Sequence, residues 1–430
     1  MLRAIDGAHG TEVRSMAMGG SVSWPAIGVA ACENVVLSQL WIHDNGTIGL
    51  MLEDQGGPTS ATLADSLIER VGDVGVVVFG AFLAVERSVV RDTSGGPLGL
   101  SGRGIDVEPS SGTATRGVTT ISQSVLARTG DTSLYLSDAD GTVARSVIVD
   151  AGAGSPGSGL GRALGVEGNA GRSTCTVSQS LIARAREIGI YGASSDLVVD
   201  LTVVRDTVPR DTDQFGGRGI NVETAPGGEP PTLVLASSVV DRSVEVGVAI
   251  IDGLATIEST LVRDTAASPV AQHYGTGVCV QEDLLAPQPT IPELVLRWSR
   301  IDGSHAFGLV TQSASATLEA VWIANTHSID QSFGDSIAVI DRSGPAWLTL
   351  VDSHLEDSAR AGLAMFGGTG RLSGTELECN VIHLTGQPHN ADFELVDEGG
   401  NRCGCAGQQD DCTVLAANLT PPEAMGPAAH

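Results

Sequence analysis

Acidic, amide and tyrosine residues recur at one position of short aliphatic segments in the middle of this chain. The sequence GIDVE at 104–108 and the sequence GINVE at 219–223 are two such segments, and an arginine precedes each of them. If each segment is a β-strand, alternate side chains face opposite sides, so its polar side chains share the face turned away from the core. The residues placed in this way are Arg103, Asp106, Glu108, Tyr135, Arg162, Glu167, Tyr191, Arg218, Asn221 and Glu223. We predict that they form a polar window of about 20 Å at strand spacing.

These residue types are suited to carbohydrate chemistry. Tyr135 and Tyr191, two repeats or ~10 Å apart, can serve as platforms for sugar rings, while carboxylates bind hydroxyl groups or Ca²⁺. A catalytic version would use two carboxylates, such as Glu108 and Glu167, around a glycosidic bond, with the pKa of one raised. A β-elimination would instead use Ca²⁺ and an arginine base. The same side chains are equally consistent with surface salt bridges on a solvated sheet.

The elements that carry this window belong to a repeat. Thirteen times an aliphatic residue is followed five positions later by another, as at Val85 and Val90, usually with a serine or threonine between them. Each repeat then ends in a short segment rich in Val, Ile and Leu, which is typical of strands. No segment has the three-and-four spacing of a helix. The sequence therefore predicts a stack of all-β units along one axis.

Short and long repeats alternate. The step from the last turn residue to the final strand is four residues in Ser243→Gly247, but twelve in Thr207→Gly219. The extra residues are rich in Gly and Pro, which favour loops. Because they recur at one turn, we expect loops such as 94–102, 208–217 and 266–275 to project from one side of the stack.

The rhythm Leu-x-x-Ser-x-Val-x-x-[Thr/Asn]…Gly-Ile-x-Val resembles that of the right-handed, single-stranded parallel β-helix, the pectate-lyase-like superfamily, over roughly residues 28–385. A leucine-rich repeat would need an Asn ladder and more leucine. The resemblance implies a solenoid of about thirteen coils, of the secreted bacterial type. We expect an incomplete first coil at 1–34, the β-helix at 35–385, a Cys-containing C-terminal cap at 386–415 and a disordered tail at 416–430. Enzymes of this fold that cleave polysaccharides make catalysis an alternative by analogy alone.

Acidic and basic residues also alternate along one column of the repeat. The column reads Asp44, Arg70, Asp92, Arg128, Asp150, Arg184, Asp206, Arg242 and Asp264. At a strand spacing of ~4.8 Å, each arginine of this run would lie between two carboxylates. We interpret the column as a solvated ladder of salt bridges with a structural role.

Composition limits the partners. The formal net charge is −27 and all 24 basic residues are arginine. This excess of acid argues against nucleic acid and anionic membranes. No apolar run is long enough to cross a membrane as a helix, and the first residues do not resemble a signal peptide. We expect a monomer, and we expect that a leader or other upstream segment is missing from this sequence.

Four of the seven cysteines lie close together near the C-terminus, at Cys379, Cys403, Cys405 and Cys412. Disulfides that close a cap are predicted, and a zinc site with His383 or His389 is an alternative. Disulfides favour an exported protein. Cys32, Cys175 and Cys279 are expected to be small thiols rather than nucleophiles.

These observations together predict a secreted or surface-attached scaffold that binds carbohydrate without catalysis on its exposed strand face. The alternative is a polysaccharide lyase or glycoside hydrolase acting along the same face. No catalytic triad or metal-ligand spacing is legible, so no catalytic residue, metal ligand or cofactor is assigned, apart from Ca²⁺ as an option.

Overall fold

The computed structural model describes residues 2–5, 8–20, 24–96, 102–152, 160–269, 274–284, 290–329 and 332–426, with side chains from residue 8 onward and at Leu2. The described residues form strands and no helix, and successive strands join three parallel sheets in turn. The predicted all-β parallel solenoid is therefore confirmed. Counted along one sheet it has about 15 coils, close to the thirteen expected.

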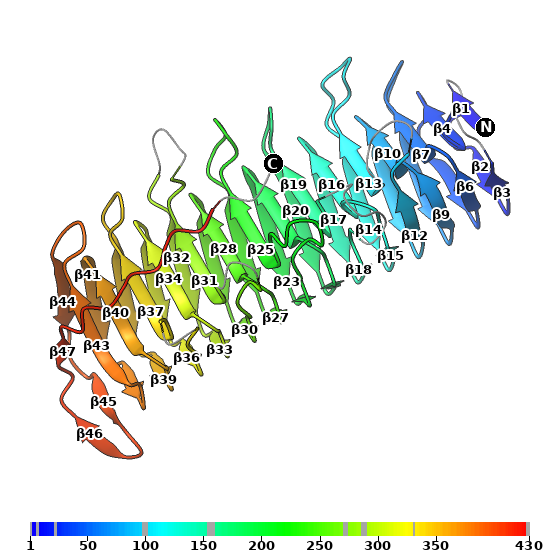
Figure 1. Cartoon of the computed structure of the whole chain (residues 1–430). Helices are drawn as coiled ribbons and strands as arrows, with labels where there is room; N and C mark the ends of the chain where they lie inside the picture. The colour runs from blue at the N-terminus through cyan, green and yellow to red at the C-terminus, as the bar shows by residue number, and fades with distance from the viewer. Residues whose placement is uncertain are drawn as a thin grey trace. The chain divides into compact units, whose positions relative to one another are not determined.

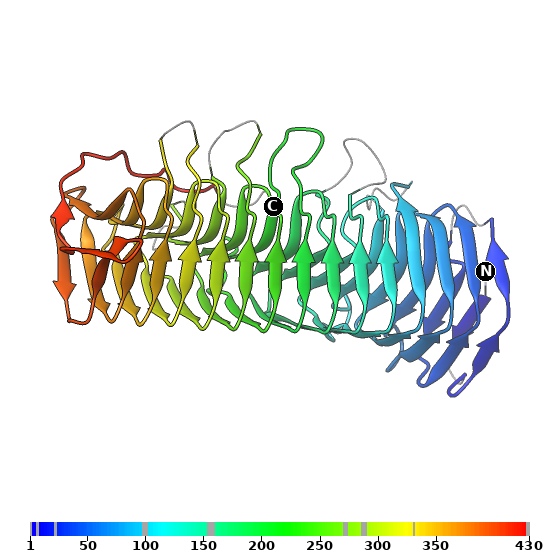
Figure 2. The same cartoon turned by 90° about the horizontal axis from the view of Figure 1, so that it is seen from below.

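The chain divides into two compact units. The first comprises Met1–Val203 and Thr207–Phe215, and the second comprises Val204–Asp206 and Gly216–His430. Each unit contains a part of all three sheets, here called A, B and C, and within each unit the coils stack in chain order (Figure 1, Figure 2).

In the first unit, each sheet takes every third strand. Sheet A contains β1 (Leu2–Ile5), β4 (Ile27–Ala30), β7 (Ile48–Glu53), β10 (Val74–Phe79), β13 (Arg103–Glu108), β16 (Leu134–Ser137), β19 (Leu164–Glu167) and β22 (Ile188–Ala193). Sheet B contains β2 (Glu12–Arg14), β5 (Val35–Ser38), β8 (Ser60–Ala64), β11 (Phe82–Glu86), β14 (Val118–Ser122), β17 (Asp140–Ala144), β20 (Ser173–Ser178) and β23 (Ser195–Asp200). Sheet C contains β3 (Ala17–Gly19), β6 (Trp41–Asn45), β9 (Leu67–Gly72), β12 (Val89–Ser94), β15 (Val125–Ala127), β18 (Val147–Val149) and β21 (Leu181–Ala183). The boundary between the units falls within β24 (Val203–Arg205).

The second unit repeats this order. Sheet A contains β25 (Arg218–Glu223), β28 (Val246–Ile251), β31 (Thr276–Gln281), β34 (Phe307–Gln312), β37 (Asp335–Ile340), β40 (Ala361–Phe366), β43 (Ile382–Gln387) and β47 (Val414–Leu415). Sheet B contains β26 (Thr232–Ala236), β29 (Leu254–Glu258), β32 (Glu293–Arg297), β35 (Ser315–Glu319), β38 (Trp347–Val351), β41 (Gly368–Ser373) and β44 (Phe393–Asp397). Sheet C contains β27 (Val239–Asp241), β30 (Leu261–Arg263), β33 (Arg300–Asp302), β36 (Trp322–Ala324), β39 (His354–Glu356), β42 (Glu376–Glu378), β45 (Arg402–Cys405) and β46 (Gln408–Asp410).

The core is built from aliphatic side chains stacked in register. On sheet A of the first unit, Val76 pairs with Ile105, Ile105 with Leu134, and Leu134 with Leu164. All four side chains are fully buried. Alternate residues of the same strands face outward, which places the predicted polar window on the outer face of sheet A.

Hydroxyl groups satisfy the backbone at one turn of most coils. The main-chain N–H of Ser88 donates to Oγ of Ser124, and the N–H of Ser124 donates to Oγ of Ser146, each over 3.1 Å. Each hydroxyl in turn donates to the carbonyl two residues earlier, as Ser88 does to Glu86. The serine or threonine between the two aliphatic residues of the repeat therefore satisfies main-chain groups that the turn would otherwise leave buried without partners.

The predicted salt-bridge ladder is present. Arg70 donates to Asp44 over 2.7 and 3.0 Å, and Arg128 donates to Asp92 over 2.6 and 2.8 Å. Each arginine hydrogen-bonds the aspartate of the preceding coil instead of being shared by two. These four residues have φ angles of 49–55°. The ladder therefore lies at a turn between sheets where the backbone is in the left-handed region.

The N-terminal coil is more complete than the sequence indicated. Strands β1, β2 and β3 pair in parallel with β4, β5 and β6. Residues 2–19 therefore contribute one strand to each sheet.

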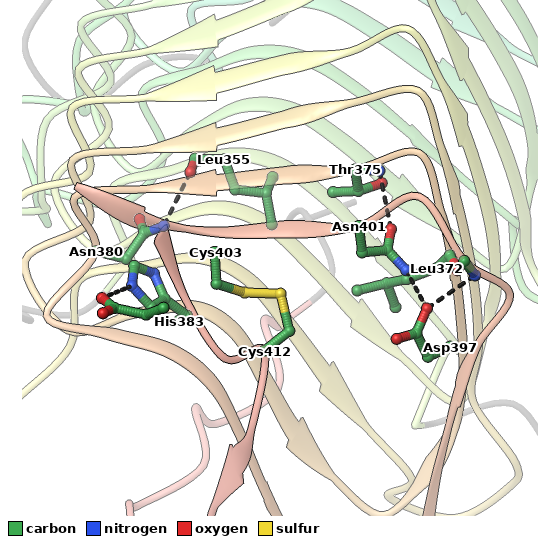
Figure 3. Close-up of a disulfide and its surroundings, with 11 residues drawn as sticks. Leu355, Leu372, Thr375, Asn380, His383, Asp397, Asn401, Cys403 and Cys412 are labelled. Atoms are coloured by element: carbon green, nitrogen blue, oxygen red, sulfur yellow. Dashed lines mark hydrogen bonds and ion pairs between the residues drawn. A yellow bond between two sulfur atoms is a disulfide. The ribbon is translucent and has the colours of Figure 1, made fainter. Parts of the chain in front are cut away.

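Two disulfides hold the C-terminal cap together, as predicted. They join Cys379 to Cys405 and Cys403 to Cys412 (Figure 3), which leaves these sulfurs unavailable to zinc. Nearby, Asn401 accepts from the N–H of Thr375 and donates to the carbonyl of Leu372 (Figure 3). Cys32, Cys175 and Cys279 are free and buried, and burial raises the thiol pKa of Cys175 and Cys279 to about 12.

Candidate functional site

The outer face of sheet A in the first unit carries a cluster of charged and tyrosine side chains. We call it the charged window and define it as Arg103, Asp106, Glu108, Asp131, Tyr135, Arg162, Glu167, Glu187 and Tyr191. Strands β13, β16, β19 and β22 bring these residues together, with Asp106 opposite Tyr135 and Gly165 opposite Tyr191 in the register. Parallel pairing thus assembles residues that lie up to 88 positions apart in the sequence.

In two coils of the window, an arginine near the start of the sheet A strand stacks on a tyrosine of the following coil. The guanidinium carbon of Arg103 lies 3.9 Å from the ring centroid of Tyr135, and that of Arg162 lies 3.7 Å from the ring centroid of Tyr191. These distances are typical of cation–π contacts. The same pair of residue types therefore recurs every second coil of the window.

The first arginine is surrounded by acid. Arg103 donates to Asp106 over 2.8 Å and lies 3.6 Å from Glu108 and 3.8 Å from Asp131. Burial raises the pKa of Asp106 to about 7, Arg103 opposes this shift, and the neighbouring Glu108 reinforces it. Oδ1 of Asp106 is buried and has no hydrogen-bond partner among the described residues. Burial therefore favours the protonated form of Asp106 more than it is favoured in a solvated carboxyl group.

The second arginine is more deeply buried. Arg162 donates to Glu187 over 3.3 Å and to Glu167 over 3.2 Å, and the side chains of Arg162 and Glu187 are at most 1% exposed. The hydroxyl of Tyr135 donates to Glu167 over 3.0 Å. Burial, followed by the charge of Glu167, raises the pKa of Tyr135, which keeps its phenol protonated. Glu167 thus links the two arginine–tyrosine pairs into one network.

The prediction that the tyrosine rings are open platforms is wrong for Tyr191, which is fully buried. Tyr135 is partly exposed, but Arg103 covers one side of its ring. A Cβ at Gly165 would lie 3.3 Å from Cδ2 of this ring, so glycine makes room for it. Tyr191 therefore offers no accessible face, and Arg103 occupies one face of the Tyr135 ring. The accessible groups are Glu108, Arg103 and Glu167, whose side chains are 36%, 22% and 19% exposed.

The remaining predicted residues belong to the second unit and are buried, which corrects their expected placement in solvent. Arg218 donates to Asn221 over 2.8 Å and to Glu245 over 3.1 Å. Asn221 in turn donates to Glu223 over 2.9 Å. Arg218, Asn221 and Glu223 are at most 1% exposed, and Arg218 also donates to the carbonyl of Gly426 over 2.8 Å.

Sequence reasoning missed three acidic partners of these arginines. Asp131, Glu187 and Glu245 each lie in a short repeat, which has no projecting loop. Each lies two residues after the last turn residue and just before the sheet A strand. Each approaches the arginine that opens the preceding sheet A strand. This shared spacing could have been recognised in the sequence, because an acidic residue occupies the same position in all three coils that follow Arg103, Arg162 and Arg218.

The window does not fit a calcium site well, because Asp106, Glu108, Glu167 and Glu187 all lie beside an arginine. Within the part of the chain that the structure describes, one group of His and Glu side chains could hold a metal ion. It consists of His354, Glu356 and Glu378 on sheet C of the second unit, and all three are partly exposed. His354 and Glu356 lie on β39 and Glu378 lies on the neighbouring β42, so the third ligand is not visible from local spacing in the sequence.

Comparisons with known proteins find similarity to solved structures at low sequence identity. No protein-family model matches the chain, and no curated protein matches it in sequence. Similar solved structures include the periplasmic alginate epimerase AlgG, with 10% identity, coverage of 88% of this chain and 77% of that one, and a TM-score of 0.45. Another is the catalytic unit of a GH87 α-1,3-glucanase from Streptomyces thermodiastaticus, with 11% identity, coverage of 98% and 65%, and a TM-score of 0.38. The surface protein and adhesin PfbA of Streptococcus pneumoniae has 9% identity, coverage of 94% and 90%, and a TM-score of 0.29.

Among the described residues, no helix has the length and hydrophobicity needed to span a membrane.

Proposed function

We propose that this protein is a secreted or surface-attached β-helix scaffold that binds carbohydrate without catalysis through the accessible part of the charged window. The observation that carries the proposal is the buried ion pair of Arg162 and Glu187. Arg162 also binds Glu167 and so holds this carboxylate at the surface of the sheet. Groups held in this way bind a ligand with little loss of side-chain entropy.

The accessible groups suit sugar hydroxyls. Glu108 and Glu167 accept hydrogen bonds and Arg103 donates them, and a sugar hydroxyl can do both. Because Tyr191 is buried and Arg103 occupies one face of the Tyr135 ring, recognition would rest on these hydrogen bonds more than on ring stacking. The net charge of −27 favours a neutral glycan over a polyanionic one.

Export is part of the proposal because the chain contains two disulfides. Such bonds persist in oxidising compartments and are rare in the cytosol.

Catalysis is the second candidate, and one observation favours it. Asp106, with a pKa raised to about 7, lies in the same arginine-centred cluster as Glu108. A protonated acid beside a carboxylate is the pair that glycoside hydrolysis requires. In that role Asp106 would donate a proton to the leaving oxygen.

A panel of neutral polysaccharides and oligosaccharides tests the proposal by calorimetry. For a glycan that the parent protein binds, Glu108→Gln and Glu167→Gln should each weaken affinity roughly 10- to 100-fold, as expected for a lost charged hydrogen bond. Glu86→Gln is the matched control, since Glu86 is an exposed acid on sheet B of the same unit.

Unchanged binding in both window variants would place the carbohydrate site elsewhere. Release of reducing ends or of unsaturated products from the same panel would replace the non-catalytic proposal by the enzymatic one. Asp106→Asn should then abolish the release.

A further inference from the structure

From β28 to β40 in the second unit, the outer face of sheet A carries a row of apolar side chains. Its outward residues form one buried cluster, made by Ala249, Ile251, Cys279, Val310, Ala338, Ile340, Ala364 and Phe366. Such a row of apolar side chains on the outside of a sheet requires a cover.

The C-terminal segment, defined here as Leu419–Gly426, provides that cover. It runs back along the second unit across β40, β37 and β34 (red in Figure 1). The sequence predicted a disordered tail from residue 416, whereas residues 416–426 have a defined path in the structure. Side chains of sheet A and its turns donate to seven of its carbonyls. The pairs are Gln387 to Leu419 at 2.8 Å, Arg360 to Thr420 at 3.4 Å, Arg342 to Pro422 at 2.7 Å, Gln312 to Glu423 at 3.2 Å, Tyr274 to Ala424 at 3.3 Å, Gln281 to Met425 at 2.7 Å and Arg218 to Gly426 at 2.8 Å.

The spacing of these donors matches an extended chain. Gln387 and Gln281 lie on β43 and β31, four strands apart in sheet A, or ~19 Å at ~4.8 Å per strand. Their acceptors, Leu419 and Met425, are six residues apart, or ~19 Å at ~3.1 Å per residue of a polyproline-type chain. The groove thus repeats its donors at the rate at which an extended polypeptide repeats its carbonyls.

The segment also has one apolar anchor. Met425 is 3% exposed and packs with Val246, Cys279, Phe307 and Val310. A cavity of about 170 Å³ remains beside it. Methionine fills such irregular spaces well, and the remaining room would accept a different apolar side chain.

The donors are matched to a peptide unit rather than to a sugar. Gln281 donates Nε2–H to the carbonyl of Met425 and accepts the N–H of Met425 at Oε1, over 2.7 and 2.9 Å. This two-way pairing imitates a β-ladder, in which main-chain groups provide affinity and one pocket provides selectivity.

We propose that this face of sheet A, from β25 to β43, is a binding groove for an extended polypeptide with an apolar anchor residue, and that the C-terminal segment is its resident occupant. A segment of the same chemistry from another polypeptide binds when the resident leaves. The proposal is independent of the carbohydrate function assigned to the first unit.

The test uses the full chain with Met425→Asp, which buries a charge in the anchor pocket and should release the segment. A fluorescent peptide of residues 416–426 should then bind the variant at least 10-fold more tightly than it binds the parent, whose groove is filled. Met16→Asp, which changes an exposed methionine of the first unit, should behave like the parent. A peptide with aspartate at the anchor position should not bind.

Hydrogen exchange of residues 419–426 makes each outcome decisive, and Met425→Ala provides a milder variant if the aspartate disturbs folding. A segment that is released while the peptide fails to bind would overturn the proposal. A segment that stays protected in both variants would also overturn it, because Met425 would not be the anchor. Binding of neutral oligosaccharides in place of the peptide would assign the groove to carbohydrate instead.

Discussion

Sheet A shows two different outer faces in the two units. In the first unit, outward positions carry Asp106, Tyr135 and Tyr191, and the face is a network of buried and half-buried charges. In the second unit, the corresponding positions of β28, β31 and β37 carry Ala249, Cys279 and Ala338, and the C-terminal segment covers them. The inward columns are aliphatic in both, so the core sets the coil while the outer face is free to differ. The difference shows that the outer face of sheet A can change its side-chain chemistry while the aliphatic core stays the same.

The largest expected effect is the loss of the buried arginine in the charged window. Arg162→Ala would leave the fully buried Glu187 without its closest charged partner. Removing one member of a buried ion pair costs about 3–5 kcal/mol. Urea unfolding should show this loss in Arg162→Ala, whereas Arg116→Ala, which breaks a more exposed pair with Asp140, should lose less than about 1 kcal/mol.

Equal losses in the two variants would mean that burial does not distinguish the window from the rest of the surface. The comparison between the two faces of sheet A would then lose its energetic basis.

A smaller effect concerns the pH dependence of stability, because an aspartate of the first unit corresponds to an asparagine of the second. Arg103 pairs with Asp106 in β13, and Arg218 pairs with Asn221 in β25, three residues later in both. The pKa of Asp106 is raised to about 7 in the folded chain, so the folded state binds more protons than the unfolded state between pH ~4 and ~7. Its contribution to stability is therefore present below pH ~4 and is lost as the pH rises through 7.

Asp106→Asn gives the first unit the amide that the second already has. The difference in melting temperature between the parent and Asp106→Asn should fall from pH 4.5 to pH 7.5. A difference that is constant over this range would show that Asp106 titrates normally.

The smallest effect is expected from the corner ladder, which both units share. Arg128→Ala removes the exposed pair with Asp92, and such pairs contribute about 0.2–1 kcal/mol. Chemical denaturation in 0.5 M salt should reduce even this difference, because salt screens exposed charges. A loss above 2 kcal/mol would make the ladder a determinant of stability comparable with the window.

The fold was predictable because its signals are local and repeated. Spacing in the sequence is enough to recognise the aliphatic pairs such as Val85 and Val90, the alternation of coil lengths and the group of four C-terminal cysteines. The accessibility of the window was not predictable in the same way. Strand periodicity shows that Tyr191 faces away from the core, but not that Arg162 lies over its ring. Likewise, the repeat pattern does not predict that residues 419–426 cover sheet A. The contact between Gln281 and Met425, for example, joins positions more than 100 residues apart.

The hairpin of β45 and β46 has a consequence for solubility. Parallel strands that end at a bare edge offer unpaired N–H and C=O groups to any other chain, which is a route to fibres. Here β46 pairs with β45 in the antiparallel sense, and the Cys403–Cys412 disulfide ties the hairpin to the chain that follows. The outer strand exposes Gln408, Gln409 and Asp410, which are polar and poorly suited to a dry sheet interface. We expect a reducing environment to loosen this closure and to increase end-to-end aggregation.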